Sequence, residues 1–202
     1  MGKCGCDQVA IDDASQKGVL VALLAINGFM FAAEAITGIL AESTGLLADS
    51  LDMLADATVY GISLYAVGRS GSIKIRAARW SGWFQIILSG GVLFEIARRY
   101  WFGSKPMAEW MIPVGLVALM ANVTCLLLLQ KHRKDEVHMR ASWIFSKNDV
   151  IANVGVIVAG GLVALTASRL PDLIIGLIIS VVVFRGGLQI LKTASAELTK
   201  SQ

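Results

Sequence analysis

The stretch GLLADSLDMLADATVYGISLYAV, residues 45–67, is long and apolar enough to cross a bilayer, yet it contains three aspartates. Asp49, Asp52 and Asp56 follow one another at spacings of three and four residues, which bring all three side chains to one stripe of a helix. A carboxylate at the centre of the hydrocarbon costs about 3 kcal/mol or more unless a cation, a proton or a polar cavity compensates it. The stretch therefore predicts a transmembrane helix that carries half of a cation site.

The composition of the whole chain also indicates a membrane protein. Of its 202 residues, 55% are hydrophobic and 16% are charged, and the mean hydropathy is +0.66. Soluble domains carry about 25% charged residues, so little of this chain is suited to face water. Stretches of about 20 apolar residues predict an all-α, polytopic membrane protein with six transmembrane helices. We place these helices at 18–41, 45–68, 80–99, 110–130, 145–167 and 171–191, which gives a transmembrane domain over 18–191 between tails at 1–17 and 192–202.

The positions of Lys and Arg predict the orientation of this bundle. If both termini are cytoplasmic, the outer segments contain only Arg98, Arg99, Lys105 and Arg169, and nearly all other Lys and Arg residues lie on the inner side. Because cytoplasmic segments are enriched in Lys and Arg, we expect both termini in the cytoplasm and the chain as a multi-pass protein of the cell inner membrane. Glu95 is expected to pair with Arg98 and Arg99. The net charge of +3 is then explained by the Lys and Arg residues on the cytoplasmic side of the lipid bilayer, and no nucleic-acid partner is needed to account for it.

Polar side chains also interrupt the first and fifth predicted helices. Asn27 and Glu34 are seven residues apart, so they share a face of the first helix. Asp149 and Asn153 are four residues apart and share a face of the fifth. Both faces can converge with the three aspartates. Asn148 is rotated by roughly 100° from Asp149, so we expect it to contribute less to a shared site.

Two stretches carry a family resemblance. ALLAINGFMFAAEAITGILAESTGLLADSLDMLAD resembles the first two helices of the cation diffusion facilitator family, whose members exchange divalent metal ions for protons. MRASWIFSKNDVIANVGVIVAGGLVALTASRLPDLIIGLIIS is similar to the fifth and sixth helices of that family, including the proline and aspartate at the start of the last helix. Members usually have a cytoplasmic metal-binding domain after the sixth helix that helps them dimerise. The resemblance is therefore to a short form, in which a homodimer is expected to form through the membrane helices.

The resemblance also implies site residues. Members bind the ion near the membrane centre with two ligand pairs, each pair spaced by four residues, on the second and fifth helices. The first pair falls on Asp52 and Asp56. In the second pair one position falls on Asp149, but the other falls on Phe145, which cannot bind a metal. Asp49 matches an additional acid, for which a supporting role is expected.

The missing fourth ligand leaves the choice of metal open. Asn153, Asn148, Asn27 or water could replace it, and each would add another oxygen to a site of carboxylates. Oxygen ligands suit Mn²⁺ or Fe²⁺, whereas Zn²⁺ also accepts carboxylates and is the ion that family members carry most often. The expected cargo is therefore a divalent ion, with Zn²⁺ favoured over Mn²⁺, Fe²⁺, Co²⁺ and Cd²⁺, and no resident cofactor is expected.

The predicted function is metal efflux coupled to proton influx by alternating access. Close carboxylates repel one another, so at least one is expected to hold a proton until a divalent ion displaces it. Because Phe145 removes a ligand, the alternative is a non-transporting metal-binding scaffold or a partner of another transporter. A proton-coupled exporter of organic cations is disfavoured by the paired motifs. No pairing of nucleophile and base indicates an enzyme.

The cysteines and histidines give weaker signals. Cys4 and Cys6 form a C-x-C pair that can hold a metal ion as thiolates, so they either capture metal before delivery or lie as reduced thiols in a polar tail. Cys125 lies in the apolar fourth helix and is expected to pack in the core. The connector KHRKDEVHMR, residues 131–140, contains His132 and His138 and is interpreted as a solvated loop.

Overall fold

The computed structural model describes residues 5–66, 71–130 and 137–200. These residues form helices and no strands, which confirms the prediction of an all-α protein. The elements are α1 (Gly5–Leu40), α2 (Thr44–Ala66), α3 (Gly71–Phe102), α4 (Ala108–Gln130), α5 (Val137–Thr166) and α6 (Leu170–Lys200). Within the described residues, four segments are long and apolar enough to cross a membrane: Lys17–Leu40, Ala108–Gln130, Asp149–Thr166 and Leu170–Lys192. The segment of α2 is not among them, because its three aspartates lie in its central part.

Several helices continue beyond the predicted spans. α1 begins at Gly5, within the predicted tail, and α6 continues to Lys200. α5 begins at Val137 instead of residue 145, so residues 137–140 of the predicted connector are helical. Apolar length predicts where a helix is buried in a bilayer, whereas backbone hydrogen bonding continues into the flanking polar residues.

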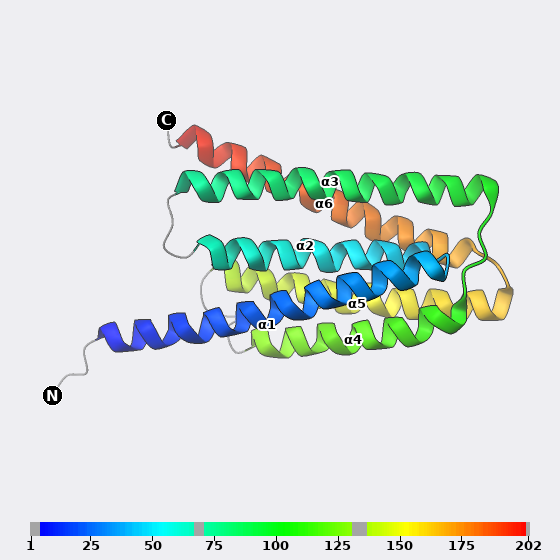
Figure 1. The fold of residues 1–202 in the computed structure, drawn as a ribbon, viewed down its shortest axis with the longest axis horizontal. Helices are drawn as coiled ribbons and strands as arrows, with labels where there is room; N and C mark the ends of the chain where they lie inside the picture. The colour runs from blue at the N-terminus through cyan, green and yellow to red at the C-terminus, as the bar shows by residue number, and fades with distance from the viewer. Residues whose placement is uncertain (1–4, 67–70, 131–136, 201–202) are drawn as a thin grey trace.

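The helices lie roughly along one long axis (Figure 1). α1 packs mainly on α2, α4 on α5, and α3 on α6, while α2 also contacts α6 and α5. The start of α1 and the end of α6 lie at one end of the bundle, and the connections 41–43, 103–107 and 167–169 lie at the opposite end (Figure 1). α2 therefore lies against α1, α5 and α6, so polar side chains of different helices can meet along it.

Glycines permit the closest approaches between these helices. A Cβ on Gly187 of α6 would lie 3.0 Å from the carbonyl oxygen of Gly82 on α3, so the two backbones nearly touch. A Cβ on Gly176 would lie 2.8 Å from the backbone of Thr44, at the start of α2. Large apolar side chains such as Phe29, 73% exposed, and Phe94, also 73% exposed, point outward. An apolar exterior around a tightly packed interior is typical of a bundle that sits in lipid.

Candidate cation site

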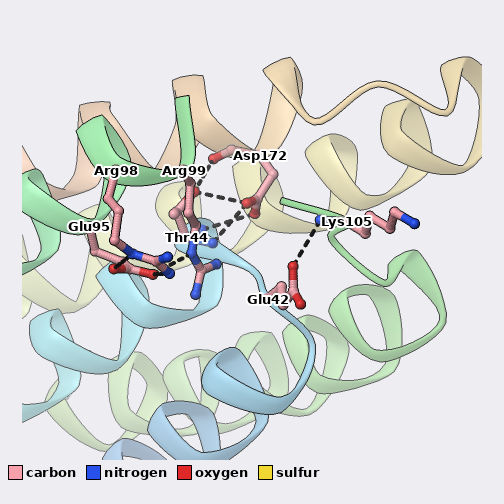
Figure 2. Close-up of polar contacts among 8 residues, drawn as sticks. Glu42, Thr44, Glu95, Arg98, Arg99, Lys105 and Asp172 are labelled. Carbon is pink, nitrogen blue, oxygen red and sulfur yellow. Dashed lines mark hydrogen bonds and ion pairs between the residues drawn. The ribbon is translucent and has the colours of Figure 1, made fainter. Parts of the chain in front are cut away.

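Asp172 anchors the first residues of α2, the helix that carries the three aspartates. The Ser43 hydroxyl donates to Asp172 Oδ1 at 2.6 Å, and the Gly45 backbone N–H donates to the same oxygen at 3.0 Å. The backbone N–H and the hydroxyl of Thr44 donate to Oδ2 at 2.7 and 2.8 Å (Figure 2). A carboxylate at a helix N-terminus complements the helix dipole and satisfies backbone donors that have no partner within the helix. The anchor fixes the position of α2 against α6.

The four predicted acidic residues meet between α2 and α5. Asp49, Asp56 and Asp149 are buried, with at most 7% exposure, whereas Asp52 is half-buried. The carboxyl of Asp149 lies near those of Asp52 and Asp56. The structure thus brings together carboxyl groups that are almost one hundred residues apart in the sequence.

Tyr60 joins the candidate site, although its sequence position was not predicted to belong there. Its hydroxyl donates to Asp56 Oδ2 at 2.9 Å, and its side chain is 1% exposed. The sequence spacing could have indicated this contact, because Tyr60 follows Asp56 by four residues and so lies on the same stripe of α2. This hydrogen bond restricts the rotation of the Asp56 carboxylate.

The polar residues of α1 point in two different directions. Glu34 is fully buried, and its carboxyl faces that of Asp49. Asn27 is also buried, but its amide donates to the Leu23 carbonyl at 2.9 Å and to Cys125 Sγ at 3.7 Å. Asn27 is therefore engaged with α4, while Glu34 joins the carboxyl groups. The prediction that Cys125 packs in the core is confirmed, because its side chain has no exposed surface.

Asn153 connects α5 to α2. Its amide nitrogen donates to the backbone carbonyl of Asp149 at 2.9 Å and to Asp49 Oδ1 at 3.3 Å. Asn153 itself has no exposed surface. Of the three asparagines considered as replacement ligands, it is the one that the described contacts attach to the acidic cluster.

The other sequence-predicted residues lie partly or wholly outside the described residues. Phe145 and Asn148 belong to α5, as do residues 137–140 with His138, but the side chains of these residues are not described. The backbone of Cys6 is helical because α1 begins at Gly5, whereas its side chain, Cys4 and His132 fall outside the described part. Metal binding by these residues therefore stays a prediction.

The carboxyl groups lie near one another, but they are not arranged around a common centre. Among the residues that the structure describes, no three His, Cys, Asp or Glu side chains are arranged so that they could hold a metal ion. A divalent ion bound by Asp52, Asp56 and Asp149 would thus require their carboxyl groups to turn toward a common centre. The buried cluster supplies the ligand chemistry, and ligation itself stays a prediction.

Glu95 is already paired at the end of the bundle opposite the termini. Its Oε1 lies 2.6 Å from Arg98 Nη2 and 2.7 Å from Arg99 Nε (Figure 2). These contacts confirm the predicted pairing. A carboxylate that holds two guanidinium groups is not a free ligand for a metal ion.

Comparison with known proteins gives consistent matches. Residues 20–199 match the family described as the cation efflux transmembrane domain. The zinc transporter ZitB of Yersinia pseudotuberculosis is 28% identical over 200 residues, which cover 92% of this chain and 64% of that protein. A cadmium, cobalt and zinc/H(+)-K(+) antiporter of Bacillus subtilis is 24% identical over 195 residues, which cover 90% of this chain and 62% of that protein. The chain thus spans a little less than two thirds of the length of these relatives.

Proposed function

The chain belongs to the cation efflux family, and we propose that it exports divalent transition-metal ions in exchange for protons. The observation that carries the proposal is the meeting of Asp52 and Asp56 on α2 with Asp149 on α5, inside a helical bundle with an apolar exterior. Ionisable residues inside a membrane bundle mark ion pathways, because burying them without such a use is costly. Both relatives named above carry metal ions according to their descriptions, which supports the same cargo class.

The exchange follows from the chemistry of neighbouring carboxyl groups. Without metal, adjacent carboxyls share protons because two or three buried negative charges repel one another. A divalent cation replaces those protons when the site faces the cytoplasm. After the bundle opens to the other side, protons compete the ion off and reset the carrier. Asp52 is the least buried of the three carboxylates, so we expect it to be the first that an incoming ion meets.

The cargo that fits best is Zn²⁺. One relative is described as a zinc transporter and the other as acting on cadmium, cobalt and zinc. The described ligand candidates are oxygen donors, which also suit Mn²⁺ and Fe²⁺. The transport assay therefore uses Zn²⁺ first and Co²⁺, Cd²⁺, Mn²⁺ and Fe²⁺ as competitors.

We also propose cytoplasmic termini, location in the cell inner membrane and a homodimer formed through the membrane helices. Lys and Arg are sparse in the segments near the connections 103–107 and 167–169, which supports placing those connections on the outer side. The start of α1 and the end of α6 lie at the other end of the bundle, as this orientation requires (Figure 1).

Reconstituted vesicles test the proposal. Purified protein is placed in liposomes that enclose a pH-sensitive dye, and proton movement is recorded after addition of Zn²⁺. We expect metal-dependent proton flux in the wild type and none in Asp52→Ala or Asp56→Ala. Glu109→Gln, an exposed acid in the first turn of α4, is the control and should transport normally. Full flux in both aspartate variants would overturn the assignment, and metal binding without any wild-type flux would favour the scaffold.

A further inference from the structure

Glu34 is a buried carboxyl whose role the aspartate site does not explain. It has no exposed surface, and within the described part of the chain neither Oε1 nor Oε2 accepts a hydrogen bond. The group that faces it is the carboxyl of Asp49, which is 1% exposed and whose Oδ2 also lacks a donor. Buried polar groups are nearly always hydrogen-bonded, so these carboxyl oxygens are expected to bind a water, a proton or an ion.

Asn153 connects a third helix, α5, to this pair. Both hydrogen bonds of its amide nitrogen are described, one to Asp49 Oδ1 at 3.3 Å and one to the Asp149 carbonyl at 2.9 Å. These two bonds fix the orientation of the amide. Its Oδ1 is buried and accepts no hydrogen bond from any described residue. Oδ1 and the nitrogen that donates to Asp49 are bonded to the same carbon, so this oxygen belongs to a side chain that contacts Asp49.

We propose that Glu34, Asp49 and Asn153 form a second station for the divalent cation. α1, α2 and α5 each contribute one side chain, and the atoms left without donors are all oxygens. Carboxylate and amide oxygens without donors are the surroundings that a divalent cation stabilises. The station differs from the site of Asp52, Asp56 and Asp149 because Glu34 belongs to another helix and faces Asp49.

The position of Asp49 gives the station a place in the transport path. This inference rests on the proposed function, because it assigns a direction to the ion. Asp49 precedes Asp52 by about 4.5 Å of helix rise and Asp56 by about 10 Å. It is thus nearer to the connection 41–43, which lies on the outer side in the proposed orientation. An ion leaving Asp56 and Asp149 outward would meet this station next.

The two sites are expected to be filled in turn. Asp52 lies close enough to act electrostatically on both Glu34 and Asp49, so the acids form one continuous negative region. Two divalent ions held within about 10 Å of each other along α2 repel each other strongly at low dielectric. Arrival of an ion at one site therefore favours departure from the other, which is the behaviour expected of a release step.

Binding in a protein without the principal site isolates the second station. The full chain carrying both Asp52→Ala and Asp56→Ala is titrated with Mn²⁺, and free Mn²⁺ is followed by electron paramagnetic resonance. We expect this variant to retain weaker binding of one Mn²⁺ per chain. Adding Glu34→Gln should weaken that residual binding at least tenfold, whereas adding Glu109→Gln should leave it unchanged. Gln preserves the size of the side chain, removes its charge and replaces one carboxylate oxygen with an NH₂ group.

A second variant and a separate assay make the outcomes distinct. Adding Asp49→Asn instead of Glu34→Gln should also weaken the residual binding at least tenfold, so the result does not depend on the folding of one variant. The inference is overturned if the doubly substituted chain binds no Mn²⁺, or if its binding survives both Glu34→Gln and Asp49→Asn. Failure of the proposed function looks different, because the wild type would then show no metal-dependent proton flux in vesicles.

Discussion

Asp172 and Thr44 are 128 positions apart in the sequence, and the Asp172 carboxylate accepts hydrogen bonds from both the backbone N–H and the hydroxyl of Thr44. Both residues have no exposed surface. The Thr44 hydroxyl also lies 3.0 Å from the backbone carbonyl of Asp172. These contacts join the first residue of α2 to the first turn of α6 (Figure 2). The placement of Asp52 and Asp56 on α2 therefore depends on an acid that lies apart from the cation site.

Asp172→Asn is predicted to weaken the contact between the start of α2 and the start of α6. One carboxylate oxygen becomes an NH₂ group that cannot accept, so two of the four hydrogen bonds to the side chain are lost. Each buried donor left without a partner costs about 1–3 kcal/mol, so we expect a loss of about 3 kcal/mol in the free energy of unfolding. Thermal unfolding in detergent measures this loss of stability. The matched control is Glu42→Gln, which changes an exposed acid that accepts from the Lys105 backbone (Figure 2). Equal unfolding temperatures for Asp172→Asn and wild type would contradict the prediction.

Tyr60→Phe is predicted to weaken metal binding while leaving the fold intact. The substitution removes the hydroxyl that donates to Asp56 Oδ2 at 2.9 Å. Groups that orient a metal ligand typically contribute 10–100-fold to affinity, so we expect the Kd for Zn²⁺ to rise roughly tenfold. Competition with a fluorescent chelator measures the Kd. Tyr65→Phe is the control, because Tyr65 belongs to the same helix but is 43% exposed. An unchanged Kd in Tyr60→Phe would show that Asp56 needs no such support.

The helices and the polar face of each helix followed from the sequence because both depend on local periodicity. Apolar length predicted the helices, and spacings of three, four and seven residues predicted which polar residues share a face. Asn27 and Glu34 share a buried face, as expected. The pairing of Glu95 with Arg98 and Arg99 was also predictable, because residues three and four apart meet on a helix surface.

The partners across helices could not be predicted in this way. Asn27 and Glu34 lie on one face, yet the structure turns Asn27 to Cys125 and Glu34 to Asp49. The choice depends on the rotation and depth of each neighbouring helix, which are set by packing contacts between residues far apart in the sequence. The anchoring of α2 by Asp172 is of the same kind, since nothing near Asp172 in the sequence identifies Thr44 as its partner.

Gly187→Ala is predicted to separate α3 from α6. A Cβ at this position would lie 2.9 Å from Ile86 Cγ1 and 3.0 Å from the backbone oxygen of Gly82, which cannot move independently of α3. Overpacking of this kind costs about 1–3 kcal/mol, so the unfolding temperature in detergent should fall. Gly161→Ala in α5 is the control, because its Cβ would meet nothing within 4 Å. Alanine there should be neutral or stabilising, since it lowers the entropy of the unfolded chain. Equal effects of the two substitutions would contradict the close approach.

Phe145→His is predicted to shift the metal preference toward Zn²⁺. Phe145 belongs to α5 and precedes Asp149 by four residues, so a ligand at 145 would share a helix face with Asp149. Imidazole nitrogen suits Zn²⁺, whereas a site of oxygen donors suits Mn²⁺ as well. We expect the ratio of the Kd for Mn²⁺ to the Kd for Zn²⁺ to rise about tenfold or more, measured by competition with the same chelator for both ions. Phe94→His, on the exposed surface of α3, adds an imidazole away from the site and should leave the ratio unchanged. If the ratio in Phe145→His also stays at the wild-type value, position 145 does not face the ion, and the ligand set must be completed from Asn153, Asn148 or water.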